Sequence, residues 1–187
     1  MTQEELNKIL ENHKHWLNED CEGWENMRAN LIEANLRGAD LTRADLIEAD
    51  LRGADLTRAD LIEADLREAD LIEAKNVPFI PYSCPDFGMF IGYKKARGYI
   101  VELEIPEDAK RLSATSRKCR CNKAKVLRIL NFDKTVADVT EVRSKHDYNF
   151  IYRVGEVVTV DNFDEDRWNE CSTGIHFFIN FQEAVNY

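Results

Sequence analysis

Residues 29–73 read ANLIE ANLRG ADLTR ADLIE ADLRG ADLTR ADLIE ADLRE ADLIE, which is nine pentads without a break. Their composition favours a helix, because alanine, leucine, glutamate and arginine have high helix propensity. Their period argues against one, since successive leucines would step about 140° around a helix axis and form no apolar stripe. A plain strand is excluded as well, because an odd repeat would place every second leucine on the opposite face.

A chain that turns a corner after every pentad satisfies this period. The leucine then lies at the centre of each side, and the alanine two residues earlier also points inward. These nine pentads resemble the pentapeptide-repeat family over roughly a quarter of the chain. The resemblance implies an all-β solenoid, a right-handed quadrilateral β-helix of about 2.25 coils with four pentads in each coil. Successive coils are expected to pair through backbone hydrogen bonds.

Pentads of different sequence stack on one another in this arrangement, because the sequence repeats every 15 residues whereas one coil contains 20 residues. Arg43 is predicted to lie over Glu63, and no continuous apolar stripe forms on the outside. The aspartates before the leucines stack on one another, so they must be solvated, hydrogen-bonded or faced by a cationic partner. They form the first candidate binding surface, which consists of Asp40, Asp45, Asp50, Asp55, Asp60, Asp65 and Asp70.

Both ends of a short solenoid need caps. Thr2 and Glu5 match a capping box, and the apolar spacing that follows predicts an N-terminal cap helix over about residues 3–18. His13 is predicted to pack in this cap rather than bind a ligand. Two prolines end the repeat pattern, and the apolar residues 77–80 are expected to cover the last coil. The predicted domains are the cap, 1–22, the β-helix, 23–76, and a C-terminal domain, 77–187.

The composition is typical of a folded soluble protein, with 187 residues of which 44% are hydrophobic and 32% charged. No stretch approaches ~18 consecutive apolar residues, and the first ten residues lack the basic start and apolar segment of a secretory signal. We therefore expect a cytoplasmic location and no membrane contact. Five dispersed cysteines form no disulfide pattern and are expected to be reduced thiols.

Beyond residue 81 the pattern predicts an α+β domain with a mostly antiparallel sheet. Asn180 is expected to cap a short terminal helix. The stretches LEIP, KCRC and DEDRWNECSTGIHFF resemble an uncharacterised domain that follows pentapeptide repeats in bacterial and phage proteins, and this resemblance implies no activity. The predicted strands cover residues 90–93, 99–105, 124–130, 136–142, 152–160 and 174–178.

Cys119, Cys121, Cys171 and His176 are residue types that can bind zinc. The spacing of the first two is tighter than the usual C-x2-4-C and favours two buried thiols on one strand face. The acidic stretch 161–166 lacks the ligands of an EF-hand and is expected to be a solvated turn. A nucleophile and base made of Cys171 and His176 would lack a specified orienting carboxylate, and no phosphate loop is present. We predict no metal, no cofactor and no catalytic residue.

Charge is distributed unevenly along the chain. Residues 94–128 carry 11 basic and 4 acidic residues, whereas residues 129–187 carry 5 basic and 11 acidic ones. Solvation or pairing between these two segments is one interpretation, and an anion-binding face is the alternative. The second candidate surface consists of Lys118, Arg120, Lys123, Lys125 and Arg128.

Three functions follow from these features. The leading hypothesis is a non-enzymatic scaffold or protein-binding module whose partner is another protein, with a homodimer as an alternative. The second, implied by the resemblance, is an acidic DNA mimic that binds a DNA-processing protein such as a type II topoisomerase. The net charge of −7 in residues 29–73 is close to the roughly six phosphates in ~11 Å of duplex, but that length is only about three base-pair steps. The third is binding of nucleic acid or another polyanion by residues 94–128, where aromatic residues for base stacking are sparse.

Overall fold

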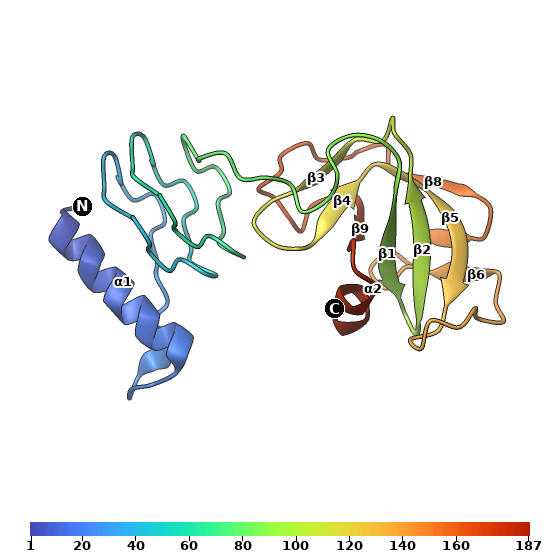
Figure 1. The fold of residues 1–187 in the computed structure, drawn as a ribbon, viewed down its shortest axis with the longest axis horizontal. Helices are drawn as coiled ribbons and strands as arrows, with labels where there is room; N and C mark the ends of the chain where they lie inside the picture. The colour runs from blue at the N-terminus through green and yellow to red at the C-terminus, as the bar shows by residue number, and fades with distance from the viewer. The chain divides into compact units, whose positions relative to one another are not determined.

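The computed structural model describes residues 1–187 and divides into two compact units, Met1–Pro81 and Tyr82–Tyr187 (Figure 1). The first unit contains helix α1 (Gln3–Asn18), the 3₁₀ helix η1 (Trp24–Asn26) and the repeats. The second unit contains nine strands and helix α2 (Phe181–Asn186). None of the helices is long and apolar enough to cross a lipid bilayer.

Every pentad turns the chain in the same way. The N–H of each alanine donates to the C=O of the leucine three residues earlier, as from Ala34 to Leu31 at 3.1 Å. The fifth residue of each pentad has a positive φ, between 53° and 67°. A turn with positive φ at its third position is of type II and favours glycine there. Only Gly38 and Gly53 are glycines, and the other fifth positions are glutamate or arginine.

Residues 20 positions apart pair with each other through single parallel bridges, such as the one between Asp40 and Asp60. The N–H of Leu31 donates to the Asp50 C=O at 2.7 Å. Four consecutive pentads therefore form one layer, as the repeat predicts. The repeats contain no regular strands, although a solenoid is expected to have them. Each parallel bridge is isolated, and no continuous or closed sheet forms.

The leucine and alanine side chains fill the interior of the repeats. Ala49 and Ala54 are fully buried between the leucines, which confirms the predicted inward register. Leu61 and Leu66 of the last layer are half-buried, whereas Leu71 of the same layer is only 1% exposed. The leucines that are at most 2% exposed are Leu31, Leu36, Leu41, Leu46, Leu51, Leu56 and Leu71.

The outward side chains also follow the predicted stacking. Arg43 donates to the Glu63 carboxylate, with 2.7 Å between Nε and Oε2. Pairs of this kind on the surface contribute only about 0 to 1 kcal/mol each. The register therefore depends on the buried leucines and the backbone bonds rather than on these ion pairs.

Helix α1 covers the first layer of the repeats (Figure 1). Its predicted capping box is present, since Thr2 and Glu5 exchange hydrogen bonds at the N-terminus. The side-chain amide of Gln3 donates to the Asp40 C=O and accepts from the Asp40 N–H, both at 2.9 Å. A preceding layer would make the same two bonds. Gln3 thus satisfies a backbone edge that would otherwise be open to pairing with another chain.

His13 binds further backbone groups at the same open edge of the first layer. Its Nδ1 accepts the Ala29 N–H at 3.1 Å, and its Nε2 lies 3.0 Å from the Ile47 C=O. Together these contacts fix the neutral tautomer with the proton on Nε2. The imidazole is fully buried and stacks on Trp16, with 5.4 Å between the ring centroids. The predicted packing role of this histidine is confirmed.

The segment after the repeats departs from expectation. Phe79 is 89% exposed, whereas Val77 and Ile80 are half-buried. The expectation that Phe79 covers the last layer is therefore wrong, because its ring points to solvent.

The second unit contains an antiparallel four-stranded sheet, an antiparallel three-stranded sheet and a hairpin, as predicted for the domain class. The four-stranded sheet has the order β1 (Phe90–Ala96), β2 (Tyr99–Ile105), β5 (Lys123–Leu130) and β8 (Val157–Thr159). The three-stranded sheet has the order β3 (Arg111–Ser113), β4 (Cys119–Cys121) and β9 (Ile175–Phe177). The hairpin pairs β6 (Glu141–Arg143) with β7 (Ile151–Arg153).

Some strand boundaries differ from the sequence-based ones. The predicted strand 152–160 is split into β7 and β8 by a turn at Gly155, whose φ of 88° lies in the left-handed region. The predicted strand 136–142 is reduced to β6, with Val136 making one isolated bridge to Leu130. Asn180 caps α2 as expected, because its Oδ1 accepts the N–H groups of the first turn.

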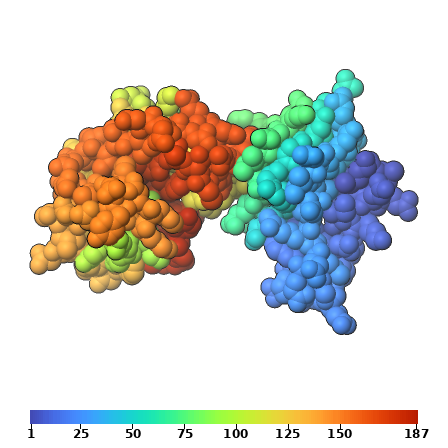
Figure 2. Space-filling view, turned by 180° about the vertical axis from the view of Figure 1, so that it is seen from behind, coloured from blue at the N-terminus to red at the C-terminus, as the bar shows by residue number.

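The two sheets of this unit join where β9 leaves its own sheet. Phe178 exchanges two backbone hydrogen bonds with Tyr93 of β1, at 2.7 and 2.8 Å. Next to this junction the Phe177 ring packs on Gly92, where an added Cβ would lie 2.6 Å from a ring carbon. Seen from behind, most of the surface of this unit is formed by the C-terminal part of the chain, in orange and red (Figure 2).

Replacing Leu51 with aspartate should unfold the repeats, because a carboxylate in their interior has no partner and its burial is costly. The matched control is Ile62→Asp, because Ile62 is 64% exposed. Circular dichroism melts of the full chain should show a lost or much lower transition for Leu51→Asp only. Equal effects of the two changes would mean that the inward register is wrong.

A second prediction concerns the cap. Burial lowers the pKa of His13 below its usual value of 6.5, with the Ile47 carbonyl acting in the opposite direction. The unfolded chain therefore binds the proton more readily than the folded chain does. The free energy of unfolding should be highest above about pH 6.5 and should fall toward lower pH by at most about 1.4 kcal/mol per pH unit.

Urea unfolding between about pH 5 and about pH 8 measures this dependence. The His13→Gln variant, which cannot titrate, should have a smaller decrease in unfolding free energy at low pH. An identical pH dependence in both proteins would contradict the assignment.

Candidate functional site

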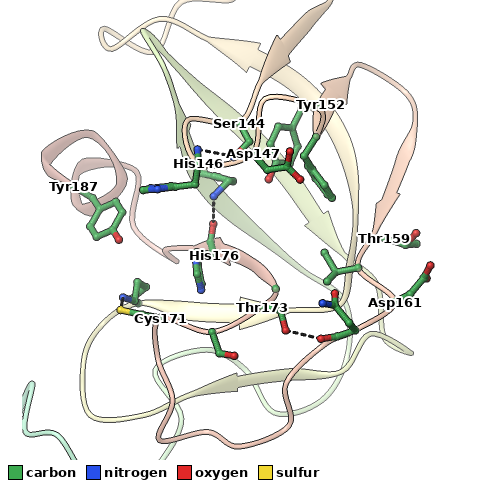
Figure 3. Close-up of a pocket in the computed structure, with 17 residues that line it drawn as sticks. Ser144, His146, Asp147, Tyr152, Thr159, Asp161, Cys171, Thr173, His176 and Tyr187 are labelled. Carbon is green, nitrogen blue, oxygen red and sulfur yellow. Dashed lines mark hydrogen bonds between the residues drawn. The ribbon is translucent and has the colours of Figure 1, made fainter.

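A cavity of about 830 Å³ opens in the second unit (Figure 3). Strands β1, β7 and β9 contribute to its walls, together with the loops that follow β6 and β8. In the view of Figure 3, Cys171 and Tyr187 lie on one side of His176, with Thr159 and Asp161 on the other. The structure thus brings Cys171 and His176 to one pocket, although Cys119 and Cys121 do not line it.

Lys94 enters this cavity from the inner face of β1. Because side chains alternate along a strand, Lys94 shares its face with Gly92 and Ala96, and both of these are buried. Its Nζ donates to the His176 C=O at 3.2 Å and lies 6.0 Å from the centroid of the Tyr152 ring. Burial lowers the pKa of Lys94 to about 8. Sequence analysis missed this residue, because the predicted strand 90–93 ends one residue before Lys94, whereas β1 continues to Ala96.

His176 lies across the β4–β9 ladder from Arg120. Its Nε2 is buried and has no hydrogen-bond partner. Burial, reinforced by the charges of Lys94, Lys118 and Arg120, lowers the pKa of His176 to about 3. The imidazole is therefore neutral at physiological pH, in a region of positive potential.

The Cys171 thiol contacts a lysine rather than the histidine. Lys118 Nζ lies 3.6 Å from Cys171 Sγ and 4.0 Å from Glu170 Oε2. The same ammonium lies 5.8 Å from the centroid of the Tyr187 ring. A thiol activated by a base needs a hydrogen bond between the two, and His176 Nε2 has no such partner in this structure.

The four residues considered for zinc do not form one cluster. Cys119 and Cys121 are fully buried on β4, and burial raises the pKa of Cys121 to about 12, which disfavours the thiolate that binds a metal. Ligand atoms do come within 4.8 Å of one another in a group that sequence analysis missed, at the end of α1. This group consists of His15, Asp20 and Cys21. The group forms where Glu19, in the left-handed conformation, ends the helix and turns the chain back toward His15.

Arg120 is not part of an exposed binding surface, so that prediction is wrong. The residue is only 2% exposed, and its guanidinium donates to three backbone carbonyls. The distances are 3.1 Å to Asp164, 2.7 Å to Asp166 and 2.7 Å to Thr173. The acidic stretch 161–166 is therefore held by a buried arginine, in addition to its own turns.

The other basic residues are mostly neutralised. Lys123 pairs with Asp108, and Arg128 pairs with Glu102 across the β2–β5 ladder. Lys125 is exposed and lies opposite Glu104 in the same ladder. These contacts agree with internal pairing of the basic run rather than with a continuous anion-binding face. Further pairs reach the acidic C-terminal segment, namely Lys110 with Glu165 and Arg117 with Glu183.

The stacked aspartates have a structural role in each pentad that contains one. The Asp40 Oδ1 accepts the Thr42 N–H at 3.0 Å, and the later aspartates accept the N–H two residues on in the same way. Asn30 and Asn35 make the same bond in the first two pentads. Hydrogen bonds from Thr57 lower the pKa of Asp55 to about 2, with a smaller effect of an arginine. The side chains at this position therefore fix the corners of the repeats.

Arginines screen part of this acidic surface. Arg52 contacts two stacked carboxylates, at 2.6 Å to Asp50 and 3.7 Å to Asp70. The other pairs are Arg37 with Asp55 at 3.2 Å and Arg67 with Asp65 at 2.5 Å. Asp40, Asp45 and Asp60 form no ion pair and are exposed, so they remain available to a cationic partner.

Comparison with known protein families identifies both parts of the chain. A family model described as a family of unknown function (DUF5758) matches residues 80–184. The chain belongs to this family. A model for pentapeptide repeats (8 copies) matches residues 27–61 and 49–75, which span the pentads and imply a β-helix. No curated protein and no solved structure matches the chain. The DUF5758 domain supplies every residue of the pocket except Tyr187.

The role of Arg120 can be tested by comparing Arg120→Met with Lys125→Met. The first change should destabilise the DUF5758 domain by about 3 kcal/mol or more, because three carbonyls lose a charged donor. The second should change the free energy of unfolding by less than about 0.5 kcal/mol. Denaturant unfolding of the full chain measures both values, and similar small effects would contradict the buried role.

Proposed function

We propose that the chain is a non-enzymatic, protein-binding scaffold whose repeats present acidic faces to a basic protein. The pentapeptide repeats and the DUF5758 domain are consistent with an interaction module. We further propose that it acts in the cytoplasm, because its five cysteines are unpaired and such thiols persist in a reducing compartment.

The observation that carries this proposal is the sorting of charge among the faces of the repeats. The parallel bridges group the nine pentads into four columns, which begin with residues 29–33, 34–38, 39–43 and 44–48. The first and fourth columns each hold four carboxylates and one arginine, and the third holds three carboxylates and one arginine. The second column holds one carboxylate and two arginines. Three faces are therefore acidic and one is weakly basic.

Rigidity makes such faces suitable for recognition. We propose that the layers wind as a right-handed quadrilateral β-helix of about 2.25 coils. Each corner is constrained by an aspartate or asparagine bond, by a bond within the turn and by bonds to the next layer. A surface that is ordered before binding loses little conformational entropy when a partner docks.

DNA mimicry has less support than protein binding through one face. Duplex DNA carries negative charge around its whole circumference. The second column, with Arg37 and Arg58 against Asp55, interrupts any such surface on the repeats. Binding of a polyanion by the basic run also has less support, because Arg120 is buried and Lys123 and Arg128 are paired.

The experiment neutralises one acidic face without disturbing its corners. Asparagine already supports the corner bond at Asn30 and Asn35, so Asp→Asn changes should preserve the fold. The test variant neutralises the fourth column with Asp45→Asn, Glu48→Gln, Asp65→Asn and Glu68→Gln. The control is Asp55→Asn in the basic column.

The full-length proteins are used to capture partners from the source cells, and the affinity of each captured protein is then measured. We expect a partner with a basic surface whose affinity falls roughly tenfold or more for the fourth-column variant and with rising salt. The control should bind like the unmodified chain. Equal affinities for the test and control variants would contradict the proposal, as would a defined enzymatic turnover that is lost in Cys171→Ser.

A further inference from the structure

We propose that the pocket of the DUF5758 domain binds a small organic anion, whose phosphate or carboxylate oxygens contact Lys94 and Lys118 beside His176. This site is separate from the acidic faces of the repeats and requires no protein partner. The shared chemistry is that of an oxyanion, and the experiment below distinguishes its two sources.

The first argument is the position of Lys94. A lysine on the inner face of a strand is unusual, because buried ammonium groups are normally paired with a carboxylate. Lys94 forms no ion pair, and its hydrogen bond goes to the neutral carbonyl of His176. This bond uses one of the three donors of the ammonium, and the residue lines the cavity. An anionic ligand would compensate this charge.

The second argument is the unpartnered Nε2 of His176. A buried polar atom without a partner costs about 1 to 3 kcal/mol, so such atoms are normally satisfied by a ligand or a water. The charges of Lys94, Lys118 and Arg120 all act on this imidazole. An anion bound among them would lower the local potential, and protonated Nε2 could then donate a hydrogen bond to it.

The acidic residues of the pocket do not provide the missing charge. Asp147 accepts the Asn149 N–H at 2.9 Å and forms no ion pair with either lysine. Asp161 also lines the pocket without an ion pair to them. Glu170 approaches Lys118 only at 4.0 Å. The two ammonium groups therefore keep most of their charge for a ligand.

The size and walls of the cavity favour an organic anion over a free inorganic ion. Its volume of about 830 Å³ lies in the range of pockets that hold metabolite-sized ligands, roughly 300 to 1,000 Å³. Aromatic rings of Phe150, Tyr152 and Tyr187 offer apolar surface for the body of such a molecule. Hydroxyl groups of Ser144 and Thr159 add hydrogen-bonding positions.

The test uses the full chain with inorganic phosphate and with acetate as separate probes. Binding is followed by the midpoint of thermal unfolding and by the imidazole resonances of His176 in NMR spectra. We expect at least one probe to raise the midpoint and to shift the His176 resonances in a saturable way. A response to phosphate alone assigns a phosphate group to the ligand, and a response to acetate alone assigns a carboxylate.

The variants are Lys94→Met, which keeps the apolar stem without the charge, and the control Lys125→Met on the exposed face of β5. Lys94→Met should raise the midpoint of the free protein, because it removes an uncompensated buried charge, and should weaken probe binding roughly tenfold or more. The control should change neither quantity.

The proposal is overturned if neither probe shifts the His176 resonances of the unmodified chain, a result that depends on no variant. It is also overturned if Lys94→Met binds as tightly as the control does. Neither result bears on protein binding by the repeats, because both experiments use only small anions.

Discussion

The constraint on which most of this structure depends is the need to satisfy backbone N–H and C=O groups outside regular helices and sheets. Side chains meet it in both units. In the repeats, an aspartate or asparagine accepts an N–H at every corner. At the open edge of the first layer, Gln3 and His13 take the place of a missing layer. In the DUF5758 domain, Arg111 and Arg120 donate to the carbonyls of the loops.

This constraint changes how the charges of the chain should be interpreted. The aspartates of the repeats, and Arg111 and Arg120 of the basic run, use their charged groups in hydrogen bonds to the backbone, which are stronger than those of neutral groups. Their number alone therefore overstates the surface that is available to a partner. What remains is the uneven distribution among the four columns, in which Arg37 and Arg58 oppose only Asp55. A binding argument has to start from this residual charge rather than from the total.

The sequence predicts the periodic parts of the fold well, because a strict repeat converts spacing directly into neighbours. The contact of Arg43 with Glu63 and the capping box at Thr2 follow from position alone. The exposure of Phe79 and the burial of Arg120 could not be obtained this way, since both depend on irregular loops without a period. The pocket was missed for the same reason, because its walls come from segments that only the folded domain brings together.

The pocket is an exception to the rule that buried polar groups in this molecule have hydrogen-bond partners. Only two buried side-chain polar atoms lack a partner, Nε2 of His176 and Oε2 of Glu183. Glu183 still receives a hydrogen bond from Arg117 through its other oxygen. His176 instead lines the cavity that Lys94 and Lys118 also line. Elsewhere in the chain, side chains satisfy the backbone groups of loops, corners and edges. The positively charged cluster around His176 is therefore best explained by a bound anion that accepts its hydrogen bonds.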